Sequence, residues 1–204
     1  MTKEFFIKNM VCDRCIKVVR NELTAEGMHV LEVFLGRVII ESEDEVLDKQ
    51  KLNKVLDANG FSLIGSPDAV ISEAVKIELI TLLNKVPLNI GGKLSDLLSA
   101  KLNSDYSKIS KIFSITEKIT IEKYFIKLKI EKVKELIQSQ EHNFTEISQL
   151  LDYNNMNYLS RQFKSETGMS LTEYKGLNED FRNSLDQIVK NIPKMLTTRV
   201  LAIL

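Results

Sequence analysis

The chain has 204 residues, of which 44% are hydrophobic and 27% are charged. This composition is typical of a globular protein and excludes a wholly disordered one, and the length suffices for two small domains. The 28 basic and 28 acidic residues cancel, so a case for nucleic-acid binding must rest on a local motif and not on net charge.

The chain begins with MTKEFFIKNMVCDRC, which lacks the charged region and apolar run of a secretory signal. No apolar run approaches the roughly 20 residues that span a bilayer, so we expect a cytoplasmic protein without a membrane partner. In a reducing compartment the two cysteines are expected to be thiols. Their Cys-x-x-Cys spacing, Cys12 and Cys15, indicates a metal or redox site.

Residues 1–66 alternate between strand and helix patterns. The predicted elements are, in order, a strand at 5–8, a helix that follows the cysteines, two strands around Gly36-Arg37, a helix over 47–56 and a strand at 61–64. A glycine between two β-rich runs is a hairpin signal, and Asn59-Gly60 is a helix stop. The order βαββαβ predicts a ferredoxin-like domain.

A linker is predicted at Gly65-Ser66-Pro67-Asp68, with Asp68 or Ser72 as the cap of the next helix. From there the pattern is helical, with one break at 87–92. We therefore expect an α+β protein with a ferredoxin-like domain over 1–66, an all-α domain over 67–176 and a helical tail of unknown role over 177–204. The phenylalanines with core-like spacing are Phe5, Phe34, Phe61, Phe113, Phe125 and Phe163.

The helical half contains an internal repeat with an offset of 50 residues. The clearest matches are residues 94–97 with 144–147, Ser110-Lys111 with Ser160-Arg161, Phe113 with Phe163 and Tyr124 with Tyr174. Each copy predicts a short helix (94–102; 144–152), a tight turn and a second helix (106–115; 155–165). The repeat therefore predicts two helix-turn-helix units.

Such a unit suits DNA because its second helix fits a major groove about 12 Å wide. The helix between the units, 121–140, is roughly 30 Å long at 1.5 Å per residue, close to one DNA turn of about 34 Å. We therefore expect the two second helices to enter successive major grooves. The candidate DNA-binding residues are Ser107, Lys108, Ser110 and Lys111 in the first unit and Asn157, Tyr158, Ser160, Arg161 and Lys164 in the second.

The two sets differ in chemistry. Arginine can bond guanine bidentately and asparagine can bond adenine, whereas Lys108 and Lys164 are better suited to phosphates. The first unit offers few long polar side chains for base edges. We therefore expect the second unit, through Asn157, Ser160 and Arg161, to carry at least as much of the specificity.

Residues 74–176 resemble the DNA-binding domain of the AraC/XylS family of transcription regulators. The resemblance rests on residues 158–174, YLSRQFKSETGMSLTEY. Leu171 stands where the family usually has proline, and Asp152-Tyr153 where it usually has glycine and an aromatic residue. The resemblance implies a non-enzymatic regulator with double-stranded DNA as partner and RNA polymerase as a candidate second partner.

Residues 3–66 resemble the heavy-metal-associated domain of copper chaperones and metal-pump N-termini. The shared features are the βαββαβ order and the loop Met10-x-Cys12-x-x-Cys15, although Asn9 replaces a usual glycine and Asp13-Arg14 are bulkier than is common. The resemblance implies that Cys12 and Cys15 bind a soft metal ion. Two sulfurs suit linear Cu(I) better than tetrahedral zinc.

Alternatives remain open at this stage. The cysteine pair can instead serve as a thiol–disulfide switch, or the N-terminal domain can be a dimerisation or partner-binding module. The chain as a whole can be a metal- or redox-responsive regulator, or a non-catalytic metal-handling or interaction protein whose helical half binds another protein. The sequence has no Ser/His/Asp pattern or phosphate-binding loop, so we predict no catalytic residue and no enzyme.

Overall fold

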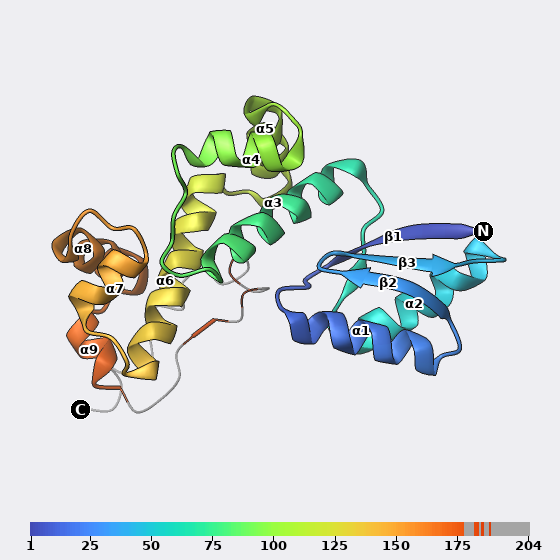
Figure 1. The fold of residues 1–204 in the computed structure, drawn as a ribbon, viewed down its shortest axis with the longest axis horizontal. Coiled ribbons are helices and arrows are strands. Elements are labelled where there is room, and N and C mark those ends of the chain that lie inside the picture. The colour runs from blue at the N-terminus through green and yellow to red at the C-terminus, as the bar shows by residue number, and fades with distance from the viewer. Residues whose placement is uncertain (178–181, 184, 186–187, 189–204) are drawn as a thin grey trace, which may run out of the picture. The chain divides into compact units, whose positions relative to one another are not determined.

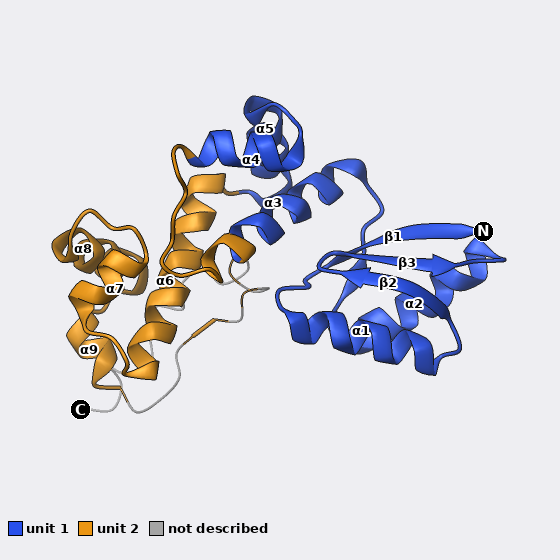
Figure 2. Cartoon of the chain, in the orientation of Figure 1, with its two compact units in different colours: residues 1–80, 94–118 blue, residues 81–93, 119–204 orange. Residues whose placement is uncertain are grey.

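The computed structural model describes residues 1–177 together with Arg182, Asn183, Leu185 and Ile188. The helix predicted within the tail 177–204 lies outside these described residues. The chain divides into two compact units, one made of residues 1–80 and 94–118, the other of 81–93 and 119–204 (Figure 2).

The N-terminal part of the first unit is a four-stranded antiparallel sheet with two helices on one face (Figure 1). Its elements are β1 (Thr2–Lys8), α1 (Asp13–Ala25), β2 (His29–Phe34), β3 (Arg37–Glu41), α2 (Glu45–Ala58) and β4 (Ser62–Leu63). The strand order is β2-β3-β1-β4. The predicted βαββαβ order, and with it the predicted α+β class, is confirmed.

This domain has its core between the sheet and the two helices. Strand side chains alternate between the two faces of a sheet, and β1 sends Phe5 and Ile7 to the helical face. Leu23 of α1 and Leu52 of α2 are fully buried against them. The apolar spacing read from the sequence is the spacing that fills this layer.

The hairpin between β2 and β3 turns at Leu35-Gly36. Gly36 has φ +78° and its carbonyl accepts the N–H of Ile7 at 2.8 Å, a conformation that favours glycine. Phe34, predicted as core, is 40% exposed because its neighbour Val33 already occupies the buried face. The guanidinium of Arg37 lies 4.4 Å from the centroid of the Phe34 ring.

The remaining described elements are helices. They are α3 (Pro67–Leu83), α4 (Leu94–Leu102), α5 (Tyr106–Glu117), α6 (Ile121–Ser139), α7 (Phe144–Leu150), α8 (Met156–Thr167) and α9 (Leu171–Lys175). Both predicted helix-turn-helix units, α4–α5 and α7–α8, are present. None of the described helices has both the length and the apolar character that a bilayer crossing requires.

The predicted cap of α3 is wrong. The helix starts at Pro67, which suits a first position because its missing N–H would have no partner in the helix. Ser66 therefore takes the capping position, and its Oγ accepts the N–H of Ala69 at 3.3 Å. Ser72 is fully buried instead, and its hydroxyl donates to Glu117.

Candidate nucleic-acid interface and cysteine loop

The later helix-turn-helix unit has well-capped helices. Asn143 and Glu146 form a reciprocal capping box at the start of α7. At the start of α8, the side chain of Asn155 accepts the N–H of Tyr158 at 2.9 Å, and Gly168 ends the helix with φ +80°. Capping of this kind fixes the start and direction of the second helix without any charged group.

The faces of α8 are clearly divided. Leu159 and Phe163 are fully buried. Asn157, Arg161 and Lys164 are exposed, and their spacing of four and three residues places them on one side of the helix, away from the buried pair. The structure therefore brings three of the predicted DNA-binding residues together on one accessible face.

The other two predicted residues of α8 lie at the margins of this face. Ser160 is half-buried. Tyr158 is 46% exposed, but its ring lies 6.1 Å from that of Tyr153, centroid to centroid. Tyr158 is thus on the flank of α8 that faces Tyr153 in the turn.

The turn before α8 is held by a contact that the sequence reading missed. Tyr153 is buried, its hydroxyl donates to Gln162 at 2.8 Å, and the ammonium of Lys129 on α6 lies 3.8 Å from its ring centroid. Burial lowers the pKa of Lys129 to about 8, partly opposed by the charge of Asp152. Burial also raises the pKa of Tyr153 well above its usual range.

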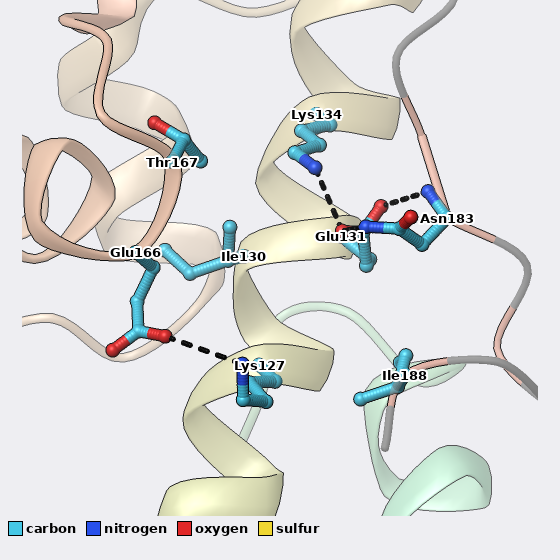
Figure 3. A pocket seen from close by; sticks show the side chains of 8 residues that line it. All are labelled: Lys127, Ile130, Glu131, Lys134, Glu166, Thr167, Asn183 and Ile188. Atoms are coloured by element: carbon cyan, nitrogen blue, oxygen red, sulfur yellow. Dashed lines mark hydrogen bonds and ion pairs between the residues drawn. The ribbon is translucent and has the colours of Figure 1, made fainter. Parts of the chain in front are cut away.

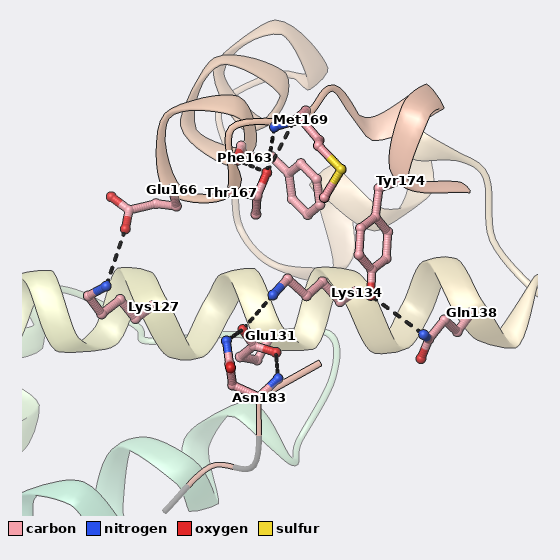
Figure 4. Close-up of polar contacts among 10 residues, drawn as sticks. All are labelled: Lys127, Glu131, Lys134, Gln138, Phe163, Glu166, Thr167, Met169, Tyr174 and Asn183. Atoms are coloured by element: carbon pink, nitrogen blue, oxygen red, sulfur yellow. Dashed lines mark hydrogen bonds and ion pairs between the residues drawn. The ribbon is translucent and has the colours of Figure 1, made fainter. Parts of the chain in front are cut away.

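Helix α6 supports the rest of the unit through polar contacts (Figure 4). Glu166 at the end of α8 pairs with Lys123 at 2.6 Å and with Lys127 at 3.8 Å. Farther along α6, the amide of Gln138 donates to the hydroxyl of Tyr174 at 3.5 Å, and the Tyr174 ring packs edge-on against Phe163. These contacts orient α8 on its supporting helix.

A small pocket lies beside α6, and its lining includes Glu166 and Thr167 at the end of α8 together with Asn183 and Ile188 (Figure 3). Its charged groups contact one another. Glu131 binds Lys134 at 2.7 Å and accepts the Asn183 backbone N–H at 2.8 Å, and Lys127 reaches Glu166. The charges here serve to hold the second unit together, so this pocket is a weak candidate for ligand binding.

The first helix-turn-helix unit presents a different surface at the start of its second helix. Asp105 caps α5, accepting the N–H and the hydroxyl of Ser107, and these bonds hold the pKa of Asp105 below its ordinary value. Ser107, Lys108 and Lys111 are exposed and Ser110 is half-buried.

The repeat makes the comparison between the units direct. Asp105 of the first unit corresponds to Asn155 of the second. A carboxylate at a helix start opposes an approaching phosphate, whereas a neutral amide does not. The hydroxyl of Ser107 is already bound to Asp105, so it is less available to a base edge than Asn157, its counterpart.

Cys12 lies at the end of the loop after β1, at the N-cap of α1, and Cys15 lies in the first turn of that helix. Their Sγ atoms are 3.6 Å apart. Burial raises the pKa of the Cys12 thiol, but hydrogen bonds from Cys15 and Arg14 and the charge of Arg14 outweigh it, so this pKa lies below its ordinary value. Burial raises the pKa of Cys15. Met10, in the same loop, is fully buried and anchors the loop to the core.

The separation of the two sulfurs can be compared with the separation that a bound soft metal ion would require. Two thiolates at a Zn–S distance of about 2.3 Å stand roughly 3.8 Å apart around a tetrahedral ion and roughly 4.6 Å apart around a linear one. The 3.6 Å separation matches the first, and linear binding needs the sulfurs to open by about 1 Å. Within the described residues no three His, Cys, Asp or Glu side chains gather as a metal site.

The pairs α4–α5 and α7–α8 have the element order of two helix-turn-helix units. Residues 98–176, less than half of the chain, match the family described as a helix-turn-helix domain. No curated protein matches the chain. The match begins within α4 and runs through α9, and it supports a DNA-binding helix-turn-helix region, in line with the AraC-type resemblance of residues 74–176. The resemblance of residues 3–66 to the heavy-metal-associated domain, and the site residues, stay predictions.

Proposed function

We propose that this chain is a transcription regulator that reads base sequence mainly through α8 and changes its DNA binding when a soft metal ion, Cu(I) first, occupies Cys12 and Cys15. The observation that carries the DNA part is the shared exposed face of Asn157, Arg161 and Lys164 on a capped helix. Arginine and asparagine are the side chains that read guanine and adenine, and the lysine suits an adjacent phosphate.

The first unit has a supporting role in this proposal. Lys108 and Lys111 are exposed and can bind phosphates. The carboxylate of Asp105 and the bound hydroxyl of Ser107 weaken base reading there. The nineteen-residue helix α6 is roughly 28 Å long, which supports binding of the two units to successive major grooves, and RNA polymerase is a candidate second partner of the bound protein.

The metal part rests on the paired thiols. Thiolates select soft ions such as Cu(I), and two of them 3.6 Å apart at a helix start can converge on one ion. When bound, the ion supplies a crosslink between the loop and the first turn of α1. The same separation favours a second candidate, a Cys12–Cys15 thiol–disulfide switch, because a small movement would join the two sulfurs.

Fluorescence anisotropy tests the proposal. A labelled duplex from upstream of the chain's own gene is titrated with the full chain at ~50 mM and ~200 mM salt. Each titration is made metal-free, with one equivalent of Cu(I) under anaerobic reducing conditions, and after oxidation of the thiols. Cys12→Ser is the matched control, since it removes one sulfur and leaves α8 untouched.

The expected result is DNA binding that weakens steeply with salt, because phosphate contacts release counterions, and that shifts with Cu(I) only when Cys12 is present. A shift on oxidation alone assigns the loop to the redox switch. Negligible affinity for every duplex at low salt would leave the helical half as a protein-binding module.

A further inference from the structure

A buried cluster of charges joins α3 to α5 within the first unit. Glu73, Lys76 and Glu117 are each less than a tenth exposed. The ammonium of Lys76 lies 2.5 Å from Glu73 and 3.3 Å from Glu117. The hydroxyl of Ser72 donates to the same carboxylate of Glu117 at 2.8 Å. One lysine therefore stands between two carboxylates that come from different helices.

Burying such a cluster of charges between two helices is energetically unfavourable compared with packing apolar side chains there. Taking charges out of water costs more than their attraction commonly returns, and apolar residues of the same size pack a core at least as well. What buried charges provide is a specific geometry, since each must keep its partners. This cluster therefore fixes where Glu117, the last residue of α5, lies relative to α3.

The other end of the cluster reaches the cysteine loop. Glu73 accepts the backbone N–H of Asn9 at 2.9 Å, three residues before Cys12. Asn9 has φ +74°, a left-handed conformation that asparagine tolerates better than most residues, and its side-chain amide donates to the carbonyl of Gly60 at 3.3 Å. The loop backbone is thus tied to α3 at a position where its conformation is unusual.

A second contact keeps α3 close to the sheet domain. An added Cβ on Gly36, in the β2–β3 turn, would lie 2.3 Å from Cδ1 of Ile77. The turn and α3 therefore pack with no room for a side chain on Gly36. Ile77 follows Lys76 directly, so the same turn of α3 contacts the sheet domain and holds the charge cluster.

We infer that the path from Asn9 through Glu73 and Lys76 to Glu117 couples the cysteine loop to the second helix of the first helix-turn-helix unit. The inference rests on the proposed function for its biological meaning. Cu(I) or a disulfide at Cys12 and Cys15 rearranges the loop that carries Asn9. The buried charges must move with Asn9 or lose a partner. The position or stability of α5 therefore changes. Glu73, Lys76 and Glu117 are positioning residues that touch neither DNA nor sulfur.

The test measures amide hydrogen exchange of α5, residues Tyr106–Glu117, in the full chain without DNA. The reduced metal-free chain is compared with the chain carrying one equivalent of Cu(I), and with the chain whose Cys12–Cys15 disulfide has been formed by diamide. A chromogenic Cu(I) chelator reports separately whether Cu(I) binds. The variants are Lys76→Met and Glu73→Leu, and the matched control is Lys134→Met, which breaks a similar buried Glu–Lys pair on α6.

In the native chain at least one of the two loop states is expected to change α5 exchange by about fivefold or more, the lower end of usual coupling factors. Lys76→Met should reduce that change to below about twofold, whereas Lys134→Met should preserve it. If Lys76→Met does not fold, Glu73→Leu decides, because it keeps the Lys76–Glu117 pair and removes the oxygen that accepts the Asn9 N–H.

Unchanged α5 exchange in both loop states of the native chain would overturn the coupling. A full response in a folded Lys76→Met chain would also overturn it, as would a full response in Glu73→Leu where Lys76→Met does not fold. The measurement separates this inference from the proposed function. Absence of DNA binding would be seen only in anisotropy, and absence of Cu(I) binding only with the chelator, while the disulfide arm still tests the path.

Discussion

Replacing Lys129 by methionine is predicted to stabilise the second compact unit, residues 81–93 and 119–204, near neutral pH. The ammonium of Lys129 lies over the Tyr153 ring, and burial lowers its pKa from 10.5 to about 8. The folded protein therefore holds this charge at a cost. Methionine keeps an unbranched apolar stem of similar length without the charge.

The magnitude follows from two opposing terms. Each unit of pKa shift corresponds to about 1.4 kcal/mol, so the lowering amounts to roughly 3 kcal/mol, reduced to about 2 kcal/mol because part of the side chain still reaches solvent. Loss of the cation–π contact with Tyr153 destabilises the variant by about 1 kcal/mol. The net expectation is a stabilisation of about 1 kcal/mol at pH 7.

The difference in unfolding free energy between Lys129→Met and the native chain depends on pH. Below pH 8 the lysine is protonated in both the folded and the unfolded chain, and the full cost is present. Between pH 8 and 10.5 the unfolded chain binds more protons, so the stability of the native chain rises with pH relative to the variant. The advantage of Lys129→Met should therefore shrink across this window and be mostly gone by about pH 10.

Urea unfolding followed by tyrosine fluorescence measures the effect, since the chain has no tryptophan and every tyrosine except Tyr106 lies in the second unit. The midpoint should rise by about 0.5 M at pH 7. A variant less stable than the native chain at pH 7, or an advantage that grows between pH 8 and 10, would refute the reasoning.

Three further substitutions give two more predictions. Asp105→Asn, which keeps a capping side chain, should tighten DNA binding most at low salt, whereas Asn155→Asp should weaken it. Fluorescence anisotropy measures both affinities. Equal changes of DNA affinity in the two variants would contradict the proposed difference between the helix-turn-helix units. Gly36→Ala should destabilise the first compact unit by about 1–2 kcal/mol, because alanine is strained at φ +78° and the Ile77 side chain must move. Chemical unfolding measures this loss, and an unchanged midpoint would contradict the packing of α3 on this turn.

Local patterns predicted the elements well. The glycine at position 36 marked the hairpin, and the repeat located α4–α5 and α7–α8 because hydrophobic periodicity and capping residues are properties of neighbouring positions. The exposure of Phe34 was missed, since spacing alone does not say which face of an edge strand is covered. Ser66 was missed because Pro67 occupies the first position of the helix, which places the cap two residues before Asp68.

Long-range contacts were outside the reach of sequence reading. Lys76 lies in a helical stretch where a solvent-facing charge is the ordinary expectation, and its pairing with Glu117 depends on how α3 meets α5. Lys129 and Tyr153 are likewise separated in sequence and meet only in the folded unit. The exposed face of Asn157, Arg161 and Lys164 was accessible because all three belong to one amphipathic helix.

Selection from a random duplex library tests most directly whether α8 reads sequence. The native chain, Arg161→Ala and the repeat-matched Lys111→Ala are each used to enrich bound DNA. The native chain is expected to select a defined site, and Arg161→Ala should lose about 1–3 kcal/mol of discrimination at one base pair while Lys111→Ala keeps the preference and binds more weakly. Enrichment of no sequence by the native chain, or an unchanged preference in Arg161→Ala, would contradict the account.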